Sequence, residues 1–287
     1  MILLQLPNGL KRKALEIADK LGDVLIDCES CFGACDLAIQ RAKLLKCEKI
    51  VHYGHSKLIE SEIPVEYIEN REEYDPLPTL KRDFNKIKGE KIGLITTLQF
   101  LDCLKKVKEF LEEKGKKVKI GKGNLYEGQI LGCDISSAEA IENEVDSFLF
   151  IGSGKFHPIG LALKTKKPIF VLDVEKNEIS EIKDLKDLFL RQKYAAIALA
   201  KNAKKIGILI SVKPGQLNLD LAKKIKKRIE EKGRKAYILV FDDIEPEKLE
   251  HFDLDCYINT ACPRIAIDNR IRFKKPILNP DEIESFI

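Results

Sequence analysis

The sequence predicts an α/β protein of three similar domains, each a small parallel sheet flanked by helices, arranged as an internal triplication. At 287 residues the chain is longer than a usual single domain. The same succession of strand and helix patterns occurs three times, and helices alternating with strands favour parallel sheets. Hydrophobic residues make up 44%, enough for packed cores. We expect domains at 1–80, 81–200 and 201–287.

Each repeat begins with a short apolar strand pattern followed by a Lys- and Leu-rich helix pattern. The first strands are expected at 2–7, 91–97 and 205–211. The helix patterns end at Gly22, Gly115 and Gly233, where a helix C-terminus favours a residue that tolerates positive φ. The first strand and the first helix therefore follow the same pattern in all three repeats.

Three further strands complete each repeat. Second strands are expected at 24–28, 117–121 and 236–241, third strands at 48–56, 146–154 and 255–263, and fourth strands at 63–69, 167–173 and 275–280. Residues 74–90 have the proline and charge content of a linker, and a helical pattern from Ser180 to Lys205 leads into the third domain.

The charge balance and the apolar runs exclude several classes of protein. Lys and Arg number 50 against 46 Asp and Glu, so the net charge of +4 does not favour nucleic acid as a direct partner. The N-terminal apolar run is too short for a signal peptide, and no run approaches the roughly 18 apolar residues of a membrane helix. We expect a cytoplasmic protein without membrane attachment, in which eight cysteines favour core residues, metal ligands or catalytic thiols over disulfides.

Three cysteines fall in loops at the ligand-binding edges of the expected sheets. In open parallel sheets, ligands bind outside the carboxyl ends of the strands. Cys35 and Cys133 follow the second strands of domains one and two, and Cys262 follows the third strand of domain three. If they converge, three thiolates hold three irons of a 4Fe-4S cluster and leave the fourth iron open to a substrate. A closed zinc site would need a fourth ligand.

The other five cysteines have simpler interpretations. Cys28, Cys47, Cys103 and Cys256 lie in or beside apolar strand and helix patterns, and we interpret them as small core or surface residues. Cys31 forms a C-x₂-C pair with Cys28, which resembles half of a zinc knuckle. A second C-x₂-C or an H-x₃-H is missing, so a local zinc site is the less favoured hypothesis.

Polar residues beside two of these loops are candidates for binding a substrate. The stretch GSGKFHP offers backbone N–H groups at Gly152 and Ser153, with Lys155 and His157 beside them. A tight turn with a solvated Lys155 and a helix-capping His157 is an equal alternative. Two further candidates, Arg264 and Asp268, follow Cys262, although helix-face spacing explains them equally well.

Four motifs in order, SCFGACDLA, GQILGCD, FIGSGKFHP and ACPRIAID, resemble those of the archaeal 2-(3-amino-3-carboxypropyl)histidine synthase family, which catalyses the first step of diphthamide biosynthesis. The resemblance implies a homodimer of three-domain subunits with a 4Fe-4S cluster on Cys35, Cys133 and Cys262. It also implies that a reduced cluster donates an electron to the sulfonium of S-adenosylmethionine. The 3-amino-3-carboxypropyl group then joins C2 of a histidine of translation elongation factor 2.

The resemblance leaves several points open. It implies methylthioadenosine as the second product and requires an electron donor, but it assigns no catalytic side chain. Under this interpretation Gly152, Ser153, Lys155, His157, Arg264 and Asp268 are candidates for binding S-adenosylmethionine. The family often has His where this chain has Phe100, so Phe100 receives no role.

Two other classes of function compete with the transferase. The same three thiols could belong to a zinc- or cluster-binding redox scaffold without transferase activity. A small-molecule binding protein is the third hypothesis, because three α/β domains with clefts at the strand ends also suit ligand capture. Such a binding protein would not need a cysteine in an edge loop of every domain.

Overall fold

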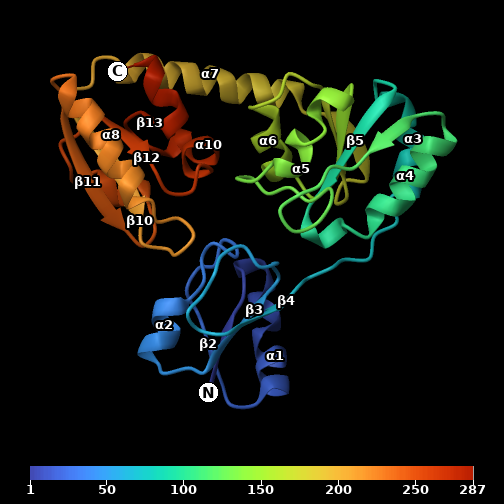
Figure 1. The fold of residues 1–287 in the computed structure, drawn as a ribbon, viewed down its shortest axis with the longest axis horizontal. Coiled ribbons are helices and arrows are strands. Elements are labelled where there is room, and N and C mark those ends of the chain that lie inside the picture. Colours follow the sequence, from blue (N-terminus) through green and yellow to red (C-terminus); the bar gives the residue numbers. More distant parts are fainter. Residues whose placement is uncertain (287) are drawn as a thin grey trace. The chain divides into compact units, whose positions relative to one another are not determined.

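A computed structural model describes residues 1–286. It contains three mainly parallel sheets (Figure 1). The strand orders are β2-β1-β3-β4, β6-β5-β7-β8-β9 and β11-β10-β12-β13, so the second strand, the first, the third and the fourth lie side by side each time. The triplicated α/β architecture is thereby confirmed. The chain divides into two compact units, one formed by Met1–Glu69 with the residues from Gln192 onward and the other by Asn70–Arg191.

The first sheet has helices on both faces. Its strands are β1 (Ile2–Gln5), β2 (Val24–Ile26), β3 (Lys49–Tyr53) and β4 (Val65–Ile68), and its helices are η1 (Asn8–Lys13), α1 (Ala14–Leu21) and α2 (Ile39–Leu44). Leu4 packs with Ala14 and Ile17 of α1, whereas Leu3 packs with the residues of α2. Because neighbouring strand residues point to opposite faces, α1 and α2 cover opposite sides of the sheet.

The second sheet carries an additional edge strand. Its strands are β5 (Lys91–Thr96), β6 (Lys117–Lys119), β7 (Ser147–Gly152), β8 (Ile169–Asp173) and the antiparallel β9 (Glu178–Glu181). Its helices are α3 (Leu77–Asp83), η2 (Phe84–Lys86), η3 (Leu98–Phe100), α4 (Cys103–Glu113), α5 (Ser136–Glu139), η4 (Glu142–Glu144) and α6 (Phe156–Ala162). Figure 1 shows α3 and α4 on one side of β5 and α5 and α6 on the other.

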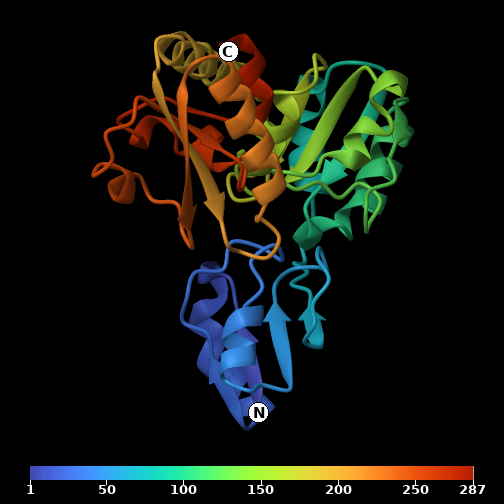
Figure 2. The same ribbon diagram turned by 60° about the vertical axis from the view of Figure 1, so that its left-hand side comes forward.

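The third sheet follows the long helix α7 (Lys183–Ala200). Its strands are β10 (Lys205–Ser211), β11 (Lys235–Phe241), β12 (Cys256–Asn259) and β13 (Ile277–Leu278), and its other helices are α8 (Leu219–Glu231), α9 (Pro246–Leu249), α10 (Ile265–Asp268), η5 (Arg270–Arg272) and η6 (Pro280–Ser285). Ile225 and Ile229 of α8 pack against Ile206 and Ile208 of β10, and α8 runs beside these strands in both views (Figures 1 and 2).

The three repeats share two local devices. Gly22, Gly115 and Gly233 adopt φ of 81°, 84° and 75°, which confirms the predicted helix ends. In addition, the acidic residue just before each third strand accepts a hydrogen bond of 2.8 Å from a backbone or terminal nitrogen at or near the start of the first strand. These pairs are Glu48 with Met1, Asp146 with Lys91 and Asp255 with Lys205.

Three sequence-based interpretations need correction. Residues 74–90 are not a linker, because α3 lies within them and Leu80 is fully buried in the core of the second sheet. The segment predicted as helix from Ser180 to Lys205 begins instead in strand β9, and only Lys183–Ala200 is helical. Strand β9 forms because β8 offers an edge on which Ile179 is buried. Cys47 lies just after α2 rather than in a helix.

The predicted boundaries near residues 80 and 200 stay predictions. No helix within residues 1–286 is long and apolar enough to cross a membrane.

Candidate functional site

Cys35 lies in a loop that follows β2 and is tied to the first strand by Gln5. The Gln5 amide nitrogen donates to the carbonyl of Asp36 at 2.7 Å, and its oxygen accepts from the N–H of Ala38 at 3.2 Å. Gln5 is fully buried, so these bonds are shielded from water. The backbone on the C-terminal side of Cys35 is therefore fixed to the centre of the first sheet.

The third domain contacts Cys35 directly through the loop that follows β10. Gly215 N–H donates to the carbonyl of Cys35 at 2.8 Å, and the side-chain amide of Gln216 donates to Cys35 Sγ at 3.5 Å. A Cβ on Gly215 would lie 2.7 Å from both Cα and Cβ of Cys35. Only glycine allows this approach, so residue 215 shapes the surroundings of the thiol.

Lys213 adds a partly buried cation, with a side chain that is 12% exposed, beside the same loop. Its Nζ lies 2.6 Å from Asp36 and 3.0 Å from Asp243, and 5.0 Å from the centre of the Phe32 ring. Burial disfavours the charge on Lys213, but hydrogen bonds to Asp36 and Asp243 outweigh burial and raise its pKa. Lys213 thus stays positively charged. Its partner Asp36 is the residue that follows Cys35 in the chain.

Cys262 follows β12, and a buried network of side chains holds its backbone. Asn259 Nδ2 donates to the carbonyl of Cys262 at 2.8 Å and to Asn279 Oδ1 at 2.9 Å. Asn279 Nδ2 donates to the carbonyl of Pro263 at 3.0 Å. Arg270 donates two hydrogen bonds to Glu282, which accepts from the N–H of Asn279. The loop that presents Cys262 is therefore fixed by buried polar groups.

Cys35 and Cys262 belong to the same compact unit and interact electrostatically. Burial raises the pKa of both thiols, and a negative charge on Cys35 raises the pKa of Cys262 further. The positive charge of Lys213 lowers the pKa of Cys35, and that of Arg264 lowers the pKa of Cys262. The Gln216 hydrogen bond also favours the Cys35 thiolate, whereas the charges of Asp36 and Asp268 disfavour thiolates at Cys35 and Cys262 respectively.

The two candidate residues after Cys262 pair with each other. Arg264 is only 5% exposed, and its Nη2 donates to Asp268 Oδ1 at 2.5 Å. Burial raises the pKa of Asp268, and the charge and hydrogen bond of Arg264 oppose this effect. The pair places both charges beside Cys262 within helix α10 and its N-cap.

Cys133 lies in an exposed loop of the other unit, after β6 and before α5. Leu131 N–H donates to the carbonyl of Asp134 at 2.7 Å, and Asp134 accepts from Ser136 N–H and from the side chain of Asn124. These bonds close a turn around Cys133. The equivalent placement of Cys35 and Cys133 in their repeats agrees with the sequence prediction.

The stretch GSGKFHP lies at the carboxyl end of β7, as expected. Gly152 ends the strand, Lys155 is at the N-cap of α6, and His157 lies in the first turn of that helix. Ser153 and His157 line a cavity of about 170 Å³, whose wall includes Phe100. Phe100, to which the sequence assigned no role, is only 4% exposed and forms a buried part of this wall.

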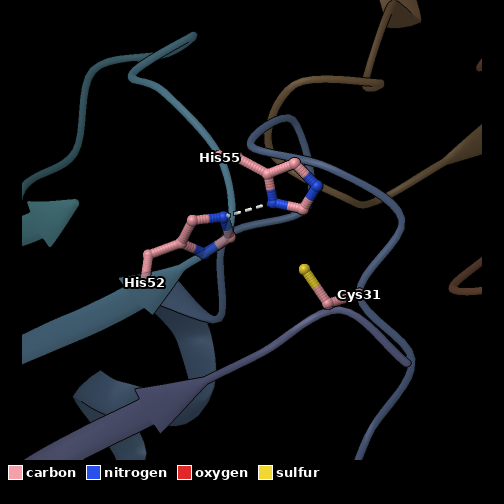
Figure 3. Close-up of side chains that lie close together, drawn as sticks. All are labelled: Cys31, His52 and His55. Atoms are coloured by element: carbon pink, nitrogen blue, oxygen red, sulfur yellow. Dashed lines mark hydrogen bonds between the residues drawn. The ribbon is translucent and has the colours of Figure 1, made fainter. Parts of the chain in front are cut away.

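Sequence reasoning missed a group of three potential metal ligands in the first domain. The ligand atoms of Cys31, His52 and His55 lie within 4.8 Å of one another (Figure 3). Burial lowers the pKa of His52 to about 3 and that of His55 to about 4, and burial raises the pKa of Cys31 to about 12. The signal in the sequence was an H-x₂-H spacing at the end of a strand.

The donors around Cys35 and Cys262 fit an anionic metal cluster. Thiolate is the usual protein ligand of iron-sulfur clusters, and a 4Fe-4S cluster bound to thiolates carries negative charge. Buried hydrogen bonds fix both loop backbones, and Gln216 donates to the Cys35 sulfur. Lys213 and Arg264 lie beside these loops, each already paired with carboxylates.

Comparisons with known proteins agree on one family. The profile of the diphthamide synthesis protein family matches residues 6–287. A 2-(3-amino-3-carboxypropyl)histidine synthase of Pyrococcus horikoshii is 39% identical over 99% of this chain and 84% of the relative. A protein of the same name from Methanocaldococcus jannaschii is 30% identical over 100% of this chain and 84% of the relative.

Comparison with solved structures indicates the same family. The crystal structure of Dph2 from Pyrococcus horikoshii superposes with a TM-score of 0.92 at 39% identity, covering 99% of this chain and 84% of that chain. A second crystal structure, of the same Dph2 with a 4Fe-4S cluster, matches with the same TM-score, identity and coverage.

Proposed function

Because the chain belongs to the diphthamide synthesis protein family, we propose that it transfers the 3-amino-3-carboxypropyl group of S-adenosylmethionine to a histidine of translation elongation factor 2. The acceptor is C2 of the imidazole, and the reaction is the first step of diphthamide biosynthesis. The observation that carries the proposal is similarity over 99–100% of this chain, and 84% of each relative, to proteins named for this synthase activity.

The net reaction is balanced without an external oxidant. The bond between sulfur and the methionine-derived γ-carbon breaks, a carbon–carbon bond forms at the imidazole, and one proton leaves C2. Methylthioadenosine is the second product. Each turnover therefore converts a sulfonium into a thioether and leaves the histidine alkylated.

The proposed cofactor is a 4Fe-4S cluster held by one cysteine of each domain, Cys35, Cys133 and Cys262. When bound, such a cluster supplies an electron that weakens the carbon–sulfur bond of the sulfonium, and an iron without a protein ligand offers a place for the substrate. The crystallised Dph2 relative with a 4Fe-4S cluster supports this cofactor. The hydrogen bond from Gln216 to Cys35 Sγ would favour the thiolate form of Cys35.

The remaining candidates are proposed to bind S-adenosylmethionine. Gly152 and Ser153 offer backbone N–H groups at a strand end, and Lys155 and His157 begin the helix that follows. Ser153 and His157 share a cavity wall, which supports a role in orienting the substrate.

The pair after Cys262 has the chemistry for the amino acid portion of the substrate. A guanidinium such as that of Arg264 binds a carboxylate through two parallel hydrogen bonds, and a carboxylate such as that of Asp268 accepts from an ammonium group. No side chain is proposed as a general acid or base.

The proposed setting follows from the substrate. A translation factor is modified where translation occurs, so we place the reaction in the cytoplasm, with a homodimer as the functional form and an electron donor as a further partner. Neither nucleic acid nor a membrane has a direct role in the proposal.

The test is a single-turnover assay with the anaerobically purified protein. Incubation with dithionite, S-adenosylmethionine and elongation factor 2 should yield methylthioadenosine and increase the mass of one histidine-containing peptide by the 3-amino-3-carboxypropyl group. Formation of 5′-deoxyadenosine would contradict the proposed bond cleavage. Colourless protein with stoichiometric zinc at the three cysteines would support the redox scaffold instead.

A further inference from the structure

We propose that Cys31, His52 and His55 form a second metal site, which binds one divalent ion of the zinc class and is separate from the three proposed cluster ligands. His52 is the fourth residue of β3, His55 follows the turn at Gly54, and Cys31 lies in the loop after β2. Figure 3 shows the sulfur of Cys31 facing the two imidazole rings. Thiolate and imidazole are both zinc ligands, and zinc sites with three protein ligands keep a fourth position for water.

The hydrogen bonds of Gln5 determine which ring nitrogen of His52 carries the hydrogen. The Gln5 amide nitrogen donates to the Asp36 carbonyl, so the Gln5 oxygen is the atom that accepts from Ala38 N–H and faces His52 Nδ1 at 2.9 Å. His52 Nδ1 must therefore carry the hydrogen, and Nε2 must carry a lone pair. An outer hydrogen bond that fixes one ring nitrogen as a donor is typical of metal-binding histidines.

The lone pair of His52 points at His55. His52 Nε2 and His55 Nδ1 are 2.9 Å apart, so in the metal-free arrangement His55 Nδ1 donates a hydrogen bond to His52. A tetrahedral zinc ion with bonds of about 2.0–2.1 Å to nitrogen holds two such nitrogens about 3.3 Å apart. The two nitrogens need to separate by a few tenths of an ångström, and the rings must turn until both lone pairs point at the ion. His55 lies in a loop that can supply this movement.

Cys31 completes the ligand set. Its sulfur makes a weak contact of 3.7 Å with the Gly33 carbonyl. Zinc binding would form one sulfur–zinc bond and release the thiol proton to solvent, while the proton of His55 moves from Nδ1 to Nε2. Within residues 1–286 the group offers three ligands, so the fourth position of a tetrahedral ion would be filled by water.

The ion would stabilise the loop that presents Cys35. Cys31 lies on the N-terminal side of Cys35, and Gln5 already holds Asp36 and Ala38 on the C-terminal side. A metal between Cys31 and the two histidines would tie the other half of this loop to β3. Binding of the ion does not depend on the proposed transferase function; only its effect on Cys35 does.

The experiment uses the full chain with Cys35, Cys133 and Cys262 all replaced by Ser, so that the proposed cluster ligands cannot bind the probe. Titration of the metal-free protein with Co²⁺ should give one bound ion per chain, the visible bands of tetrahedral Co²⁺ and a thiolate-to-metal charge-transfer band. Zn²⁺ should displace Co²⁺. Because this readout needs neither cluster nor substrate, failure of the transferase proposal would leave it unchanged.

Variants in this background assign the ligands. Adding Cys31→Ser should abolish the charge-transfer band, whereas Cys28→Ser, an exposed thiol in the same loop, should leave it unchanged. His55→Ala should weaken Co²⁺ binding by about 10-fold or more, since even loss of an outer partner costs about 10–100-fold. His55→Cys should retain the ion and strengthen the charge-transfer band, which tests the site if the other variants fold poorly.

Two results would overturn the proposal. Absence of tetrahedral Co²⁺ in the folded triple variant would show that the two histidines are only a buried hydrogen-bonded pair. A thiolate band that survives Cys31→Ser would assign the ion to another cysteine.

Discussion

Lys213 Nζ lies 2.6 Å from Asp36 Oδ2, although the two residues are 177 positions apart in the chain. The ion pair joins the loop after β10 to the loop that contains Cys35. Lys213 also reaches Asp243 at 3.0 Å, so one cation balances two carboxylates. This contact connects the first and third repeats at the point where a candidate cluster ligand is presented.

Replacing Lys213 with Met should therefore destabilise the unit formed by the first and third domains. The change leaves the buried Asp36 carboxylate without its cation, and loss of one partner of a buried pair costs about 3 kcal/mol. The measurement is the free energy of unfolding from urea titration. Lys226→Met, which removes an exposed pair with Glu230, should cost less than about 0.5 kcal/mol. Equal effects of the two variants would refute the structural role of Lys213.

Gly215→Ala should disturb Cys35 without removing any functional group. The new Cβ would lie 2.7 Å from Cys35 Cα and 2.8 Å from its carbonyl oxygen, so the backbone must move, at a cost of about 2 kcal/mol. We expect lower iron content after reconstitution and a lower melting temperature. Gly9→Ala is the matched control, since its Cβ meets nothing within 4 Å. Normal iron content in Gly215→Ala would show that the close approach has no role in cluster binding.

The hydrogen bonds of Asp83 predict that the second domain loses stability at acid pH. Hydrogen bonds from Arg82, from Ile179 N–H and from Lys86 lower the pKa of Asp83 below its usual value near 3.8. The folded state therefore binds fewer protons than the unfolded state, so this contribution to stability is complete above about pH 4 and is lost as the pH falls further. Asp83→Asn should lower the unfolding midpoint at pH 7, and its difference from wild type should shrink below pH 3.8. A constant difference across this range would contradict the assignment.

The sequence predicted the strands and their order of appearance because each is a short apolar run bounded by glycine or polar residues. The helix ends at Gly22, Gly115 and Gly233 were predictable for the same local reason. Strand β9 was missed, because its pairing depends on the exposed edge of β8 rather than on its own residues. Helix α3 was mistaken for a linker because Pro76 and Pro78 resemble a linker composition, although they lie at the start of a helix in which Leu80 is buried.

The candidate site was predictable only in part. The repeat placed Cys35, Cys133 and Cys262 at strand ends, since equivalent positions in a triplicated fold fall in equivalent loops. The contacts of Lys213, Gly215 and Gln216 with the Cys35 loop join distant segments, so no local pattern could reveal them. The approach of His52 and His55 to Cys31 likewise depends on the pairing of strands.

The most direct test of the proposed cluster is the iron and acid-labile sulfide content of anaerobically reconstituted protein, compared among single serine variants. Wild type and the exposed-thiol control Cys28→Ser should contain one 4Fe-4S cluster per chain. Cys35→Ser, Cys133→Ser and Cys262→Ser should each lose most of the iron and the electron paramagnetic resonance signal of the reduced cluster. Full cluster content in any of these three variants would contradict the proposed ligand set.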